Sequence, residues 1–87
     1  MKNINVKIYS TDVCPYCVRA KNLLKKEGMS FEEINITKDP EKREEMLKLS
    51  GGRTSVPQIF IESRHIGGSD DLAKFVNDGK LKELIES

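Results

Sequence analysis

The sequence predicts an α/β fold in which a four-stranded mixed sheet is flanked by helices, in the order β-α-β-α-β-β-α-α. Three observations predict it: short apolar segments with strand alternation, longer segments with helical spacing between them, and glycine or proline residues at the junctions. The chain has 87 residues, enough for one small core but not for two domains. We therefore expect residues 1–87 to form a single domain.

The first expected unit is a strand followed by a helix within residues 4–28. In the strand, apolar residues at positions 4, 6 and 8 alternate with Asn5, Lys7 and Tyr9. Pro15 stands where proline is tolerated best, at the first helical position, and Gly28 ends the helix. The expected apolar side of this helix consists of Cys17, Val18, Ala20, Leu23 and Leu24.

A second strand and helix follow directly. Residues 31–36 form the strand, and Asp39-Pro40-Glu41 opens a helix whose acidic first turn suits the helix dipole. We expect Met46, Leu47 and Leu49 to face inward. The two strands and the helix between them predict a right-handed βαβ crossover, which makes the strands parallel.

The last part of the chain predicts a hairpin and two helices. Residues 56–61 and 64–66 form the hairpin strands around the turn Glu62-Ser63. After Gly67-Gly68 breaks the second strand, Ser69 is the expected N-cap of a helix, and Gly79 separates a short final helix. The inward residues are Leu72, Phe75 and Val76 in the third helix and Leu81, Leu84 and Ile85 in the last.

Composition excludes several classes of function. With 15 Lys+Arg against 14 Asp+Glu the net charge is +1, so we expect neither a nucleic-acid surface nor a basic membrane face. No apolar segment approaches the ~20 residues that span a bilayer, and the N-terminus shows no signal-peptide core. We therefore expect a cytoplasmic protein. Because the cytoplasm is reducing, we expect a cysteine pair there to serve in redox cycling or metal binding.

The two cysteines are the most informative residues. In Cys14-Pro15-Tyr16-Cys17 they begin a helix within a βαβ pattern, an arrangement typical of thioredoxin-like redox motifs. The helix N-terminus should lower the pKa of Cys14, which we expect to be the exposed attacking thiolate, with the more buried Cys17 as resolving thiol. Two buried apolar cysteines are a weaker interpretation, and a zinc site weaker still because four ligands are usual and His65 is the only histidine. We expect His65 to be an exposed hairpin residue.

Three segments carry a family resemblance over essentially the whole chain. Cys14-Pro15-Tyr16-Cys17, residues 55–60 (SVPQIF) and residues 67–71 (GGSDD) resemble the signature segments of dithiol glutaredoxins of the CPYC, bacterial glutaredoxin-3-like type. The resemblance implies a thioredoxin-like fold and a glutathione-dependent thiol–disulfide oxidoreductase. It also implies glutathione as co-substrate, no bound cofactor and no metal.

The resemblance also implies a glutathione site. Val56 would offer its backbone N–H and C=O to the cysteinyl part of glutathione beside a cis Pro57. The start of the third helix would take the γ-glutamyl carboxylate, with Asp71 or Asp70 near the substrate ammonium. The full set of expected glutathione-binding residues is Thr11, Tyr16, Arg53, Ser55, Val56, Pro57, Gly68, Ser69, Asp70 and Asp71.

Thr11 departs from the resembled pattern, because many glutaredoxins have a lysine at this position. A hydroxyl carries no charge to hold a thiolate, and the next residue, Asp12, could raise the pKa of Cys14 if its carboxylate lies close. Arg53 is a candidate partner for the glycyl carboxylate of glutathione. Cys14 is therefore expected to be less acidic than is usual in the family, unless Arg53 or another cation compensates.

Three alternatives remain open at this point. A redoxin reduced by a thioredoxin reductase would keep the fold and the thiols but lose the glutathione site. An iron–sulfur carrier would be a dimer holding a cluster with Cys14 of two subunits and two glutathiones, a reading that the rigid Pro15 disfavours. A non-enzymatic interaction module is the third. Our expectation is a monomer that acts on disulfide-containing or glutathionylated proteins.

Overall fold

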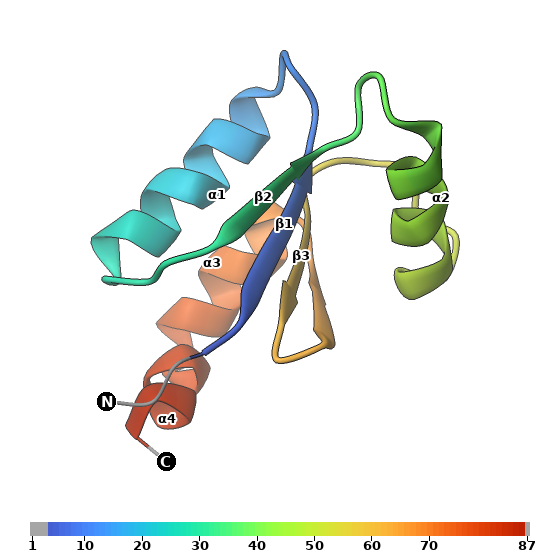
Figure 1. Ribbon diagram of the computed structural model, residues 1–87. Helices are drawn as coiled ribbons and strands as arrows, with labels where there is room; N and C mark the ends of the chain where they lie inside the picture. Colours follow the sequence, from blue (N-terminus) through green and yellow to red (C-terminus); the bar gives the residue numbers. More distant parts are fainter. Residues whose placement is uncertain (1–3, 87) are drawn as a thin grey trace.

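The computed structural model describes residues 4–86, with side chains described for residues 4–84 (Figure 1). The elements follow the predicted order: β1 (Val6–Ser10), α1 (Pro15–Lys26), β2 (Glu32–Asn35), α2 (Pro40–Leu49), β3 (Gln58–Ile61), β4 (Arg64–Gly67), α3 (Ser69–Asn77) and α4 (Lys80–Glu86). None of these described helices has the length and apolar character needed to cross a membrane. The predicted inward side chain of Ile85 lies outside the described part.

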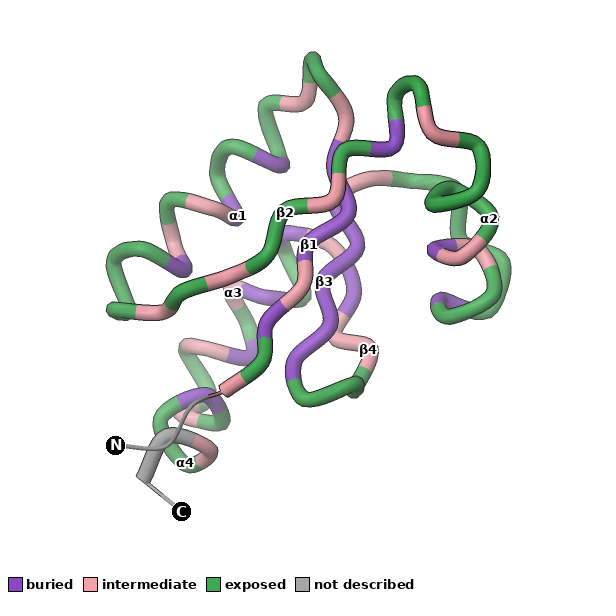
Figure 2. The backbone as a smooth tube through the Cα atoms, viewed as in Figure 1, coloured by how far each residue is buried: buried purple, intermediate pink, exposed green. Residues whose placement is uncertain are grey.

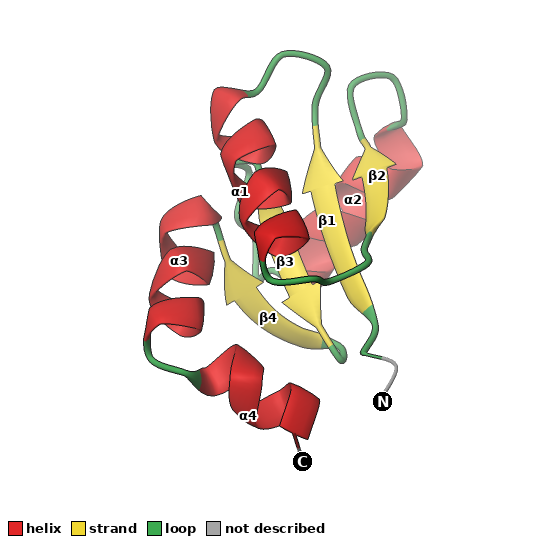
Figure 3. Cartoon of the chain, turned by 90° about the vertical axis from the view of Figure 1, so that its left-hand side faces the viewer, coloured by secondary structure: helices red, strands yellow, loops and turns green. Residues whose placement is uncertain are grey.

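The sheet is mixed, as predicted. Its strand order is β2-β1-β3-β4, with β1 parallel to β2 and antiparallel to β3, and β4 antiparallel to β3. In the view of Figure 3, α1 and α3 lie in front of the sheet and α2 lies behind it. The architecture is therefore a thioredoxin-like layer structure, with the parallel β1-α1-β2 crossover joined to an antiparallel hairpin.

Both faces of the sheet are buried, and the buried residues concentrate along β1 and β3 (Figure 2). The face beneath α1 and α3 carries Val6 and Ile8 of β1 and Ile59 and Ile61 of β3, as strand alternation requires. Their partners from the helices are Ala20, Leu24, Leu72, Phe75 and Leu81. The opposite face packs Tyr9 and Phe60 against Ile36 and Met46.

Two predicted core residues are wrong. Val18 is 52% exposed because the buried side of α1 follows Cys17, Ala20 and Leu24, and the next residue after Cys17 is turned about a quarter turn away. Leu49, 55% exposed, is the last residue of α2, a helix that has Met46 as its fully buried residue. Short helices that cover one side of a sheet bury a narrower stripe than their apolar content suggests.

Helix α2 is attached to the sheet by a polar contact as well. The Tyr9 hydroxyl, at the end of β1, donates a hydrogen bond to Glu45 Oε1 at 2.5 Å, and Lys42 Nζ lies 3.3 Å from Glu45 Oε2. The hydrogen bonds from Tyr9 and then Lys42 lower the pKa of Glu45 below its ordinary value. A lowered pKa in the folded state stabilises the protein at pH values above the ordinary pKa of glutamate. This contribution is lost as the pH falls through the pKa of Glu45 in the folded protein.

Tyr9→Phe is expected to raise the pKa of Glu45 toward its ordinary value and to lower stability at neutral pH by about 1–2 kcal/mol, since a charge-assisted hydrogen bond is lost. Carboxyl NMR titration measures the pKa, and urea unfolding at neutral and acidic pH measures the stability. The difference between the two proteins should shrink at a pH where Glu45 is protonated in both. A stability difference between wild type and Tyr9→Phe that stays constant across this pH range would contradict the role given to Glu45. Glu45→Gln, which has no carboxyl to titrate, is the matched control.

Candidate active site

The cysteine pair opens α1. Cys14 is the N-cap in extended conformation (φ −152°, ψ 95°), Pro15 is the first helical residue, and Cys17 is 1% exposed inside the first turn. The two residues form a disulfide with their Cα atoms 5.1 Å apart. Cys14 is half-buried, so it is less exposed than predicted, but it is more exposed than Cys17, as predicted.

A backbone donor faces the outer sulfur. The N–H of Cys17 donates to Cys14 Sγ at 3.0 Å, and the first turn of α1 contains no acidic residue. An N–H group at a helix start stabilises negative charge, so this geometry suits a thiolate at Cys14 after the disulfide is reduced. That the pKa of Cys14 is lowered stays a prediction.

The loop before Cys14 is fastened to the segment after β2. The Asp12 N–H donates to Thr37 Oγ1 at 2.8 Å, and Asp12 Oδ1 accepts a hydrogen bond from Asn35 Nδ2 at 2.7 Å. Asn35 Oδ1 in turn accepts from the Thr37 N–H at 2.9 Å. The Asp12 carboxylate is thereby engaged on the β2 side of the loop, and its expected effect on the pKa of Cys14 stays a prediction.

A groove of about 180 Å³ brings together three segments that are distant in sequence. They are the start of α1, the loop before β3, and the turn between β4 and α3. The lining residues are Tyr16, Arg53, Ser55, Val56, Pro57, Gly68, Ser69, Asp70 and Asp71. This is the full expected set except Thr11, a half-buried loop residue that is not part of the lining. The Val56–Pro57 peptide bond is cis, as the resemblance implies.

The turn into α3 corrects one prediction. Gly68, not Ser69, is the N-cap, and Ser69 is the buried first residue of the helix. A side-chain cap at position 68 is replaced by Asp71, whose Oδ2 accepts from the Gly68 N–H at 3.0 Å. Arg53 Nη1 lies 3.7 Å from the same oxygen. The helix start and the guanidinium together provide donors for anionic groups at this end of the groove.

Two residues behind the groove were not predicted as part of it. Gln58 is completely buried, and its Nε2 donates to the Ser55 carbonyl oxygen at 3.0 Å and to Ser55 Oγ at 3.2 Å. Its Oε1 lies 2.7 Å from His65 Nε2. A glutamine at the start of a buried apolar strand needs buried partners, and this requirement is the sequence signal that could have found the pair.

His65 is half-buried, so the expectation of an exposed hairpin residue is wrong. Its ring stacks on Phe60 with centroids 5.0 Å apart and reaches Gln58 from β4. Burial lowers the pKa of His65 below its ordinary value, and the charge of Arg53 lowers it further, while Asp71 opposes the shift. The lowered pKa favours the neutral form of the imidazole.

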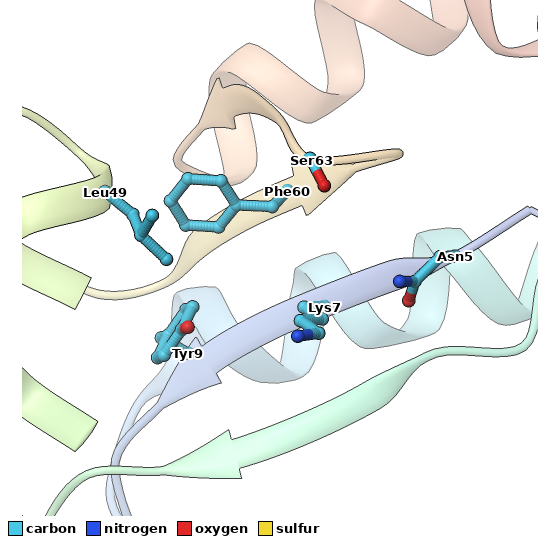
Figure 4. Close-up of a pocket in the computed structure, with 6 residues that line it drawn as sticks. All are labelled: Asn5, Lys7, Tyr9, Leu49, Phe60 and Ser63. Carbon is cyan, nitrogen blue, oxygen red and sulfur yellow. The ribbon is translucent and has the colours of Figure 1, made fainter. Parts of the chain in front are cut away.

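A second pocket, of about 80 Å³, is shown in Figure 4. Its walls come from β1, β3, the β3–β4 turn and the end of α2: Asn5, Lys7, Tyr9, Leu49, Phe60 and Ser63. It shares no lining residue with the groove. Neither cysteine lines either pocket, but the groove is lined by Tyr16, which stands between Cys14 and Cys17 in the sequence, so the groove is the candidate active site.

Known proteins match both the sequence and the fold. The glutaredoxin family model matches residues 6–66. Glutaredoxin 3 of Escherichia coli is 54% identical over 82 residues, 94% of this chain and 98% of that protein. The solution structure of glutaredoxin from Brucella melitensis is 50% identical with a TM-score of 0.78, covering 92% of this chain and 86% of the other. A buckwheat glutaredoxin solved as a glutathione complex is 30% identical with a TM-score of 0.79, covering 90% and 73%.

Proposed function

This chain belongs to the glutaredoxin family and is a thiol–disulfide oxidoreductase, and from that premise we propose that glutathione is its co-substrate. The observation that carries the proposal is the groove beside Tyr16, on the same helix that Cys14 caps. Its lining contains nearly all the residues expected for glutathione. The buckwheat relative, solved as a glutathione complex, supports the same ligand.

The proposed reaction begins with the Cys14 thiolate. It attacks the glutathione sulfur of a protein–glutathione mixed disulfide, and the protein thiol leaves as Cys14 becomes glutathionylated. A second glutathione thiolate then attacks that glutathione sulfur, which releases glutathione disulfide and restores the Cys14 thiolate. With a protein disulfide, Cys17 attacks the Cys14 sulfur of the mixed disulfide instead. The product of this route is the Cys14–Cys17 disulfide, which two glutathiones reduce.

The groove has a suitable group for each charged part of glutathione. The backbone of Val56 would pair with the cysteinyl residue as an added strand does, and the start of α3 would hold the γ-glutamyl carboxylate. Asp71 or Asp70 would face the ammonium group, and Arg53 the glycyl carboxylate. Thr11 remains a proposed contact from outside the lining.

The proposal extends to setting and partners. We propose a cytoplasmic monomer that acts on disulfide-containing or glutathionylated proteins, with no bound metal or organic cofactor and with no nucleic-acid or membrane partner. The near balance of positive and negative residues supports the last two. Glutathione acts as a substrate, and reducing equivalents reach it from outside this chain.

The test supplies the same glutathione mixed disulfide with two reducing systems. With glutathione, glutathione reductase and NADPH we expect rapid NADPH consumption, and with thioredoxin reductase and NADPH we expect a rate near that of the protein-free control. The reverse result would indicate the redoxin alternative. An anaerobic visible spectrum of the purified protein with glutathione and iron tests the carrier alternative, for which a cluster chromophore is required.

A further inference from the structure

Gln58, which is buried, and His65, which is half-buried, lie beside the segment proposed to bind glutathione. Gln58 follows Pro57 as the first residue of β3, and His65 reaches it across the hairpin from β4. Neither residue lines the groove. The contact of Gln58 with Ser55, and that of His65 with Gln58, nevertheless bear on how the groove presents its backbone.

The direction of each hydrogen bond in this pair is determined by the carbonyl oxygen of Ser55. A carbonyl oxygen only accepts, so the Gln58 amide must turn its Nε2 toward Ser55. Oε1 therefore faces His65, and the imidazole must donate from Nε2. His65 thus selects one orientation of the buried amide, and its stacking on Phe60 restrains the ring.

The amide in turn determines where the next N–H points. Among the described residues the cis bond is Val56–Pro57, so the Ser55–Val56 peptide is trans. In a planar trans peptide the C=O and the following N–H point in opposite directions. Because the Ser55 carbonyl points at buried Gln58, the Val56 N–H points away from it, and no described residue accepts a hydrogen bond from that N–H.

We propose that Gln58 and His65 are positioning residues that aim the Val56 N–H at the cysteinyl carbonyl of glutathione. This inference rests on the proposed function and adds to it a reason why the peptide edge is ready before the ligand arrives. Without the Gln58 donor, the Ser55–Val56 peptide is free to turn. The groove then loses its directed donor while Cys14 and its helix start stay unchanged.

Gln58→Met and Gln58→Leu test the donor, because neither a thioether nor a hydrocarbon side chain can donate to Ser55, and methionine nearly keeps the length of the side chain. For a glutathionylated substrate we expect KM to rise about five- to tenfold, the effect of about one lost hydrogen bond, with kcat within about twofold. Reduction of insulin disulfides with dithiothreitol as reductant, which involves no glutathione, should keep its wild-type rate. An unchanged KM, or equal losses in both assays, would overturn the proposal.

His65 provides the matched pair. His65→Gln keeps an N–H donor in reach of Gln58 Oε1 and should restore a KM within about twofold of wild type, whereas His65→Leu should raise KM as the Gln58 variants do. A purely structural role predicts that both His65 variants change stability and leave KM alone. Nitrogen-15 NMR of the wild-type ring should show the Nε2–H tautomer, and the Nδ1–H tautomer would contradict the relay. If a Gln58 variant does not fold, the His65 pair still decides the question.

Different results would overturn the glutathione-dependent function and the positioning role of Gln58 and His65. Wild-type protein without glutathione-dependent turnover would overturn the proposed function and this inference together. Wild-type turnover with a normal KM in folded Gln58→Met and His65→Leu would overturn the positioning role alone. Thermal unfolding followed by circular dichroism establishes which variants are folded before the kinetics are compared.

Discussion

Cys14→Ser is expected to reduce turnover of a glutathione mixed disulfide by about a thousandfold or more, because a serine hydroxyl is not ionised at neutral pH and is not a nucleophile toward sulfur. Cys17 cannot replace it. Its sulfur is almost fully buried inside the first turn, and its own backbone N–H is the donor that faces position 14. The loss should appear in kcat/KM in the coupled assay with glutathione reductase.

Cys17→Ser is the matched control, and its expected result differs between two substrates. Removal of glutathione from a mixed disulfide needs Cys14 and a second glutathione, so this activity should remain within about tenfold of wild type. Reduction of a protein disulfide that proceeds through the Cys14–Cys17 disulfide should be largely lost. Turnover by Cys14→Ser equal to wild type would contradict the mechanism, and so would equal losses in the two cysteine variants on the mixed disulfide.

The order of the elements could be predicted because each boundary has a local chemical cause. Pro15 starts α1, and Gly28, with φ +74°, allows the chain to leave it. The alternation in β1 is confirmed by Val6 and Ile8 on one face of the sheet and Tyr9 on the other. Periodicity could not show that α2 covers the second face, so the complete burial of Tyr9 follows from tertiary packing.

The candidate site also has a part that could be predicted from local sequence rules and a part that could not. The placement of Cys14 and Cys17 follows from local rules for helix starts, whereas the groove joins segments that residue chemistry alone does not connect. The family resemblance supplied that connection for all the lining residues. The prediction for His65 was wrong because the exposure of this residue depends on Gln58, its neighbour across the hairpin. Gln58 needs hydrogen-bond partners because its strand is buried, and the sequence alone does not show that burial.

Gly67→Ala is expected to lower stability by about 2–4 kcal/mol, through backbone strain and the loss of a helix cap. Gly67 has φ +122°, a conformation that residues with a side chain rarely adopt. A Cβ at this position would lie 2.8 Å from Asp71 Cγ and 2.9 Å from Asp71 Cβ. Asp71 would have to turn away, giving up its contacts with the Gly68 N–H and with Arg53.

Gly68→Ala is the control one residue along. Gly68 has φ −86°, and a Cβ there would meet the Pro57 carbonyl oxygen at 3.7 Å, an ordinary contact, so its stability should stay within about 1 kcal/mol of wild type. Urea unfolding compares the two variants, and equal losses would contradict the assigned cause.

A double-mutant cycle separates the two contributions at Gly67. In an Asp71→Ala background the overlap with the carboxylate and the capping carboxylate itself are gone, while the 2.9 Å contact with the Cβ of residue 71 remains. Gly67→Ala should then cost the backbone strain and this one contact, about 1–3 kcal/mol. A cost as large as in the wild-type background would place the whole effect in the backbone and the Cβ contact. A smaller cost would show that the position of the Asp71 carboxylate, which caps α3 and contacts Arg53, depends on the absence of a side chain at position 67.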